Sequence, residues 1–270
     1  MGSVKDFDYS QITVVVGVDE HTLPMLEVSL PTWLKNRPQM RDMPWLVFYD
    51  GLESRPSLEF LHRMPLVNWE ALIAYHGSQY ETQREKMLSG WVHVPPKYVT
   101  TPFWMKIDCD ALALEPNEDW LDPEWFEPDG LNRYNCWIAS GWNYSKSKGG
   151  GGSIWNWADN LEAWGDSFTG LPRLGLRERI VGDKIKYPRM ASWLSYYRTD
   201  WTKELSKSCS DFCGEGKCVV PSQDTTAWYF SERRQDKVHK AKQKKRGWTN
   251  VSRLGNLRER AREIMEETTV

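Results

Sequence analysis

Two aspartates separated by one residue, Asp108 and Asp110, form the pattern in this sequence with the clearest chemical use. They follow the apolar run Phe103–Ile107, which predicts a β-strand. Side chains alternate between the two faces of a strand, so both carboxylates are expected on one side and Cys109 on the other. Paired carboxylates with room for water and phosphate suit Mg²⁺ or Mn²⁺. A cation held there would stabilise negative charge on a departing diphosphate.

The elements before this pair predict an open parallel sheet. Apolar strands alternate with helical stripes, and the motif would lie at the carboxyl end of a central strand, where such sheets bind ligands. Pro31 predicts a kink or a break in the first helix. The elements expected are strands at 12–18, 45–49, 66–69 and 103–107, and helices at 22–34 and 81–91.

Other polar residues are expected near the same edge of the sheet. Asp19 and Asp50 directly follow the first and second strands. A carboxylate there can accept hydrogen bonds from a base or a ribose hydroxyl, although capping of the local turn is an alternative. Arg84, on the helix before the Asp108 strand, could neutralise a phosphate, and a surface role is its alternative.

The segments ITVVVGV (12–18), WLVFYDG (45–51) and WMKIDCDALAL (104–114) together resemble the nucleotide-binding half of GT-A glycosyltransferases. WIASG (137–141) resembles the glycine-containing strand that approaches the donor sugar in that family. PSQDTTAWYF (221–230) is similar to its acidic motif at a helix start, although Gln223 replaces the glutamate of many members. The resemblance covers most of residues 12–240.

The resemblance implies a Rossmann-like α/β fold and a metal-dependent transfer of sugar from a nucleotide-sugar to an acceptor hydroxyl. Asp108 and Asp110 would bind Mn²⁺ or Mg²⁺ together with His239, for which a solvated position is the alternative. Asp108 and Gly141 would contact the donor, for which a UDP-sugar is one candidate. Asp224 would be the catalytic base of an inverting displacement. A helix N-terminus favours its ionised form, and a capping role is the alternative.

The expected organisation is one transferase domain over residues 1–240, with a nucleotide-binding half at 12–115 and an acceptor half at 130–240. A basic helical tail follows at 241–270, with a charged helix over 254–265. Lys and Arg dominate from Arg233 to Arg262, and Trp248 lies among them. Such a segment could follow a phosphate backbone and stack on a base. The acceptor could therefore be a hydroxymethylated base in DNA, as for phage-type enzymes; a saccharide or a protein is the alternative.

The cysteines allow a second metal hypothesis. Cys209, Cys213 and Cys218 could bind zinc with a remote fourth ligand such as His239, but a glycine-rich loop with incidental thiols is favoured. Five cysteines, and an N-terminus without an apolar stretch, favour a cytoplasmic location, in the host if the protein is viral. No membrane partner is expected.

Two other function classes compete with the transferase hypothesis. A nucleotidyltransferase would also use paired carboxylates, but it should have a glycine-rich loop after the first strand, and VGVDEHTLP (16–24) supplies none. A non-catalytic nucleic-acid-binding protein would show salt-dependent DNA binding without chemistry on nucleotide-sugars.

Overall fold

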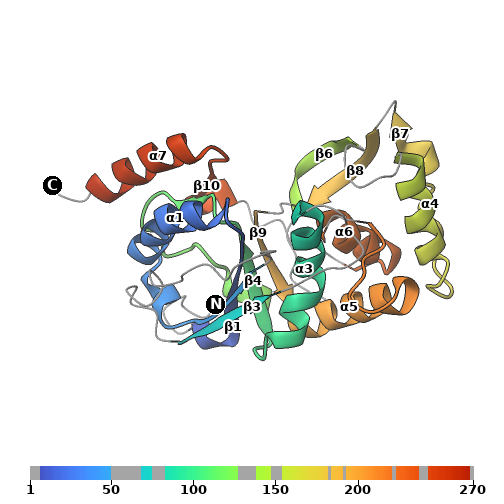
Figure 1. Cartoon of the computed structure of the whole chain (residues 1–270), viewed down its shortest axis with the longest axis horizontal. Coiled ribbons are helices and arrows are strands. Elements are labelled where there is room, and N and C mark those ends of the chain that lie inside the picture. The colour runs from blue at the N-terminus through green and yellow to red at the C-terminus, as the bar shows by residue number, and fades with distance from the viewer. Residues whose placement is uncertain are drawn as a thin grey trace.

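The computed structural model describes residues 7–49, 68–74, 83–126, 138–146, 154–181, 184–190, 193–220, 223–236 and 243–267. Its core is a five-stranded sheet (Figure 1). In spatial order the strands are β3 (Asn68–Ala74), β2 (Pro44–Tyr49), β1 (Ile12–Val18), β4 (Phe103–Ile107) and β9 (Leu194–Arg198). The first four are parallel and β9 is antiparallel to β4. The expected mostly parallel α/β sheet is therefore confirmed.

Helices cover both faces of this sheet. Every residue of β1 is buried, as its β-branched sequence predicts for a central strand. Val14 packs on the side of α1 (Leu23–Asn36), whereas Val15 packs on the side of α3 (Gln83–Tyr98) and α5 (Thr199–Cys213). The two apolar layers hold the carboxyl ends of β1 and β4 beside each other.

A smaller sheet and two further helices form the other half of the molecule, on the right of Figure 1. The strands β6 (Ile138–Lys146), β8 (Lys184–Met190) and β7 (Ile180–Val181) are antiparallel in that spatial order. Beside them lie α4 (Ile154–Gly165) and α6 (Gln223–Arg233). Short 3₁₀ turns occupy Tyr9–Gln11, Pro38–Arg41, Pro123–Phe126, Arg177–Arg179 and Gln243–Arg246.

The C-terminal segment is packed against the half of the molecule that contains the five-stranded sheet. Strand β10 (Trp248–Asn250) pairs antiparallel with β5 (Ala111–Ala113), which directly follows the two aspartates. Helix α7 (Leu254–Glu266) lies beside α1, as Figure 1 shows. Lys35 of α1 donates to the carbonyl of Ile264 (2.6 Å), which ties the two helices together. The helix expected at 254–265 is confirmed.

Several expected elements differ from the structure in their extent. Helix α1 continues through Pro31 rather than breaking there, because the residues around the proline, such as Trp33, are buried against the sheet. Strand β3 starts two residues after its expected start at Leu66. Helix α5 was not expected, although Trp201, Leu205 and Cys209 have the spacing of a buried helical stripe. Among the described helices, none is long and apolar enough to span a bilayer.

Candidate metal and nucleotide site

The two aspartates lie in a tight turn between β4 and β5. Strand β4 ends at Ile107, and the backbone N–H of Ala111 donates to the carbonyl of Asp108 (3.0 Å). Distant elements anchor the backbone of all three motif residues. Asp108 N–H donates to Trp193 O (2.8 Å), Ser29 Oγ donates to Cys109 O (2.7 Å), and Val251 N–H donates to Asp110 O (2.9 Å). The turn is thus held from three directions.

The middle residue of the motif faces the core. The Cys109 side chain is buried, and its Sγ lies 3.4 Å from the carbonyl oxygen of Gly17 in β1. Burial raises the pKa of this thiol far above its usual range, followed in effect by the charge of Asp108. Asp108 and Asp110 are both only partly buried. The inward position expected for the thiol is therefore confirmed, and a shared direction of the two carboxylates stays a prediction.

Asp108 forms an ion pair with Lys106, two residues earlier on β4. The Lys106 side chain is 3% exposed, and that of Asp108 is 34% exposed. The ammonium group also lies 4.3 Å from the ring centre of Trp91 in α3, a cation–π distance. Sequence reasoning missed Lys106, although alternation along β4 places it on the same face as Asp108.

Asp110 supplies the observation that points to a cation. Its Oδ1 is buried and accepts no hydrogen bond from any described residue. Burial raises the pKa of this carboxyl to about 6, the charge of Asp108 adds to the rise, and Lys106 opposes it. A buried carboxylate oxygen without a donor is costly, and a divalent cation would relieve that cost. The residues present therefore fit a metal held by Asp108 and Asp110.

No third ligand joins the pair among the residues that the structure describes. Within those ranges, no three His, Cys, Asp or Glu side chains lie close enough to hold a metal ion. His239, the expected third ligand, and Asp50, an expected nucleoside contact, lie outside the described residues. Arg84 lies at the start of α3 and Gly141 within β6. The metal and donor roles of these residues remain predictions.

Asp19 caps the turn after β1. Its Oδ1 accepts from the backbone N–H groups of His21 (2.9 Å) and Thr22 (2.7 Å), and from Thr22 Oγ1 (2.8 Å). The carboxylate therefore organises the start of α1, which is the capping role that the sequence left open. The expected contact of Asp19 with a nucleoside, which would use its other carboxylate oxygen, stays a prediction.

Asp224 lies in the first turn of α6 and is 8% exposed. The preceding residue, Gln223, donates from Nε2 to the hydroxyl of Tyr197 in β9 (2.6 Å). Strand β9 pairs with β4, and the Tyr197 ring stacks on Trp104 at 4.5 Å. The start of α6 is thus attached to β9, the neighbour of the strand β4 that leads into the two aspartates.

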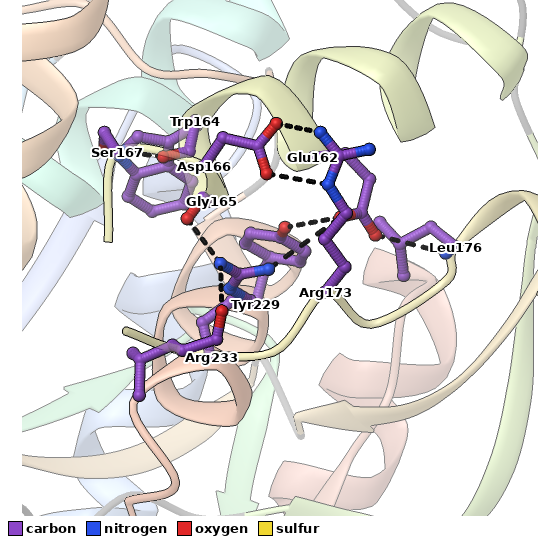
Figure 2. Close-up of polar contacts among 10 residues, drawn as sticks. Glu162, Trp164, Gly165, Asp166, Ser167, Arg173, Leu176, Tyr229 and Arg233 are labelled. Carbon is purple, nitrogen blue, oxygen red and sulfur yellow. Dashed lines mark hydrogen bonds and ion pairs between the residues drawn. The ribbon is translucent and has the colours of Figure 1, made fainter. Parts of the chain in front are cut away.

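The far end of α6 is attached to α4 through Arg233 (Figure 2). This buried guanidinium donates to the carbonyl of Gly165 (2.5 Å) and lies 3.9 Å from Glu162 Oε2. Tyr229 donates to the same carboxylate (3.4 Å). A Cβ atom on Gly165 would lie 2.2 Å from the Tyr229 hydroxyl, so glycine is required for this close approach.

The thiol cluster does not match the zinc hypothesis. No group of three ligands among the described residues could hold a metal. The favoured glycine-rich loop is also wrong for Cys209 and Cys213, which lie in α5. Instead, Cys218 Sγ lies 3.3 Å from Nε2 of His93 in α3. Burial alone would raise the pKa of Cys218, but hydrogen bonds with Cys209 and His93 outweigh it and lower that pKa to about 6.

The role expected for Trp248 is wrong. Its ring is fully buried, under the guanidinium of Arg37 at 5.0 Å, because β10 inserts it beside β5. A buried ring cannot stack on a nucleic-acid base. Arg246 is also engaged within the protein, with Asp122 and with the ring of Trp125 at 4.6 Å.

A cavity of about 700 Å³ lies elsewhere, between α5 and the end of α6. Phe168, Phe212 and Phe230 contribute to its lining, and neither Asp108 nor Asp110 does. The cavity is therefore not the space in front of the paired carboxylates.

Comparisons with known proteins agree with this geometry at the level of the fold. The sequence matches no protein-family model and no curated protein sequence. Among solved structures, core-mannan synthase A from Aspergillus fumigatus, in its Mn/GDP form, has 12% identity and a TM-score of 0.56, covering 87% of this chain and 76% of its own. The mannosyltransferase Ktr4p from S. cerevisiae has 8% identity and a TM-score of 0.52, with 81% and 66% covered. A GDP complex of the same protein scores 0.51 at 9% identity, over the same shares of the two chains.

Proposed function

The fold established above is that of GT-A glycosyltransferases, and it is the premise from which we propose that this chain is a metal-dependent, nucleotide-sugar-dependent glycosyltransferase. One observation carries the proposal. The carboxyl end of β4 presents two carboxylates, and one of them has a buried oxygen without a hydrogen-bond donor among the described residues. Ligands bind at this edge in open α/β sheets.

In the proposed mechanism Asp108 and Asp110 would hold Mn²⁺ or Mg²⁺, and this cation would supply charge neutralisation for the leaving nucleoside diphosphate. The two side chains have distinct environments. Asp108 is partly exposed and faces Lys106, whereas Asp110 has a buried Oδ1 and a raised pKa. Their backbone anchors keep the carboxylates in place before any ligand arrives, so little reorganisation is needed on binding.

Asp224 is the proposed general base. It lies in the first turn of α6, at the positive end of the helix dipole. The proton of the acceptor hydroxyl would pass to this carboxylate as the oxygen attacks the sugar, with inversion at the reacting carbon. Gln223 holds this turn against Tyr197, so the carboxylate is supported by the sheet.

Asp19, Asp50, Arg84 and Gly141 are proposed donor contacts, and His239 is proposed as a third metal ligand. The A. fumigatus structure is a Mn/GDP form, which supports including GDP-sugars beside UDP-sugars among the donors to be tested. For the acceptor, burial of Trp248 removes the aromatic platform on which a DNA acceptor depended. A saccharide acceptor is now favoured over DNA and protein.

The experiment is a donor screen. The purified protein is incubated with Mn²⁺ and each of a panel of GDP- and UDP-sugars, with oligosaccharides or hydroxymethylated DNA, and release of nucleoside diphosphate is measured. Release with one donor class, abolished by Asp110→Asn and retained by the exposed control Asp119→Asn, is the expected result. Pyrophosphate release instead would favour the nucleotidyltransferase. No metal-dependent turnover of any donor, with DNA binding retained, would favour the binding protein.

A further inference from the structure

Lys106 is an unusual residue for its position. It lies within β4, paired with Val15 of β1 on one side and Ser195 of β9 on the other. Its side chain is only 3% exposed. A buried ammonium group is costly unless it is compensated, so its retention in the middle of a sheet indicates a specific partner.

Two contacts of Lys106 belong to the candidate site. Its Nζ pairs with Asp108 Oδ1 and lies 4.3 Å from the ring centre of Trp91. Asp110 lies two residues after Asp108 in the same turn. One cation is therefore held at the turn that carries both carboxylates.

We propose that Lys106 is a resident cation of the donor site, which balances Asp108 and Asp110 before a divalent metal binds and then interacts with the diphosphate of the nucleotide. This inference rests on the proposed function. Once the metal takes over the charge of both carboxylates, the ammonium group is no longer needed to offset them. It then adds positive charge where a diphosphate must be held.

Electrostatics predicts opposite effects of Lys106 on the two ligands. The ammonium group repels a divalent cation and competes with it for Asp108, so the lysine weakens metal binding in the absence of nucleotide. The same charge attracts a diphosphate, so the lysine strengthens nucleotide binding once the metal is present. A lysine that only filled space or stabilised the sheet would change both affinities in the same direction or neither.

The test compares Lys106→Met, which removes the charge, with Lys106→Arg, which keeps it. Lys97→Met is the matched control, because Lys97 is an exposed residue of α3 whose loss changes the net charge equally. The affinity for Mn²⁺ without nucleotide is measured by electron paramagnetic resonance. The affinities for GDP and UDP at saturating Mn²⁺ are measured by calorimetry.

For Lys106→Met we expect Mn²⁺ to bind about tenfold more tightly, and the nucleoside diphosphate about tenfold more weakly. Lys106→Arg and Lys97→Met should stay near the wild type. Equal weakening of both ligands, or no change in either, overturns the inference while leaving the proposed function intact. If the wild-type protein binds no Mn²⁺, that result contradicts the proposed function itself, and the inference about Lys106 is contradicted with it.

A measurement on the wild-type protein covers the case in which Lys106→Met does not fold. With ¹³C-labelled lysine, the Lys106 side-chain signal is assigned by its loss in Lys106→Arg. It should shift when Mg²⁺ is added and shift again when GDP or UDP follows. If the signal shifts after neither addition, Lys106 does not move from Asp108 to the diphosphate and the inference is wrong.

Discussion

Gln223 donates a 2.6 Å hydrogen bond to the hydroxyl of Tyr197, and this contact joins the first turn of α6 to the central sheet. The Tyr197 ring stacks on Trp104, four residues before the first aspartate of the turn. The proposed base and the proposed metal ligands are therefore positioned through one strand pair, β4 and β9.

Removal of the Asp224 carboxylate tests its role as base. Asp224→Asn should lower kcat by roughly 10²–10⁴-fold, because the hydroxyl of the acceptor substrate would lose the carboxylate that takes up its proton. The dissociation constant of the donor should change little. Steady-state kinetics with a direct donor-binding measurement separates the two quantities. A large loss of donor affinity at unchanged kcat would place Asp224 in donor binding instead.

Neutralising Asp110 tests the metal site more directly. Asp110→Asn should reduce kcat by about 10²-fold or more, since charge on the leaving diphosphate would lose its stabilisation. The variant should also be at least as stable as the wild type near neutral pH, because an ionised carboxyl whose pKa is raised to about 6 destabilises the fold. Chemical denaturation at pH 7.5 and metal titration check both expectations. Wild-type Mn²⁺ affinity in the variant would contradict the assignment.

The strands of the central sheet could be predicted from sequence because their signals are local. Apolar runs predict β1, β2 and β4, and the aspartates directly follow one of them. The C-terminal segment could not be predicted in this way. Arg37 donates to the carbonyls of Arg246 and Gly247, which lie 209 and 210 positions later, and such contacts leave no local pattern. The composition of this basic segment predicts that its residues are exposed to solvent. Long-range contacts instead bury Trp248, which lies in the same segment.

Trp248 therefore has a structural role that can be measured. Trp248→Ala should lower the free energy of unfolding by about 3–5 kcal/mol, the usual cost of deleting a fully buried aromatic side chain. Affinity for DNA at a fixed salt concentration should not depend on this ring in protein that remains folded. Urea denaturation and a filter-binding assay give the two values. Selective loss of DNA binding at unchanged stability would restore the base-stacking hypothesis.

The Cys218–His93 contact predicts a pH dependence. The folded-state pKa of Cys218 is about 6, below the usual value of 9.0. At a pH between these two pKa values, this thiol is therefore more fully protonated in the unfolded chain than in the folded protein. This thiolate should therefore contribute stability that grows as the pH rises above 6 and is lost as the pH falls through 6. Denaturation midpoints between pH 5.5 and 8 should rise more in the wild type than in Cys218→Ser. Thiolate absorbance at 240 nm should titrate in the same window, and an identical titration in the variant would assign it to another group.

The approach of α4 to α6 predicts a pair of variants whose effects are not additive. Gly165→Ala places a methyl group 2.2 Å from the Tyr229 hydroxyl, so the two helices must separate or the tyrosine must move. We expect a loss of roughly 1–3 kcal/mol in the free energy of unfolding, the range for overpacking in a dense interior. Tyr229→Phe removes the clashing oxygen at the cost of one 3.4 Å hydrogen bond to Glu162. Gly165→Ala should therefore cost less in the Tyr229→Phe background, and a double-mutant cycle by urea denaturation measures the difference. Equal costs in both backgrounds would show that the hydroxyl does not limit how closely the helices approach.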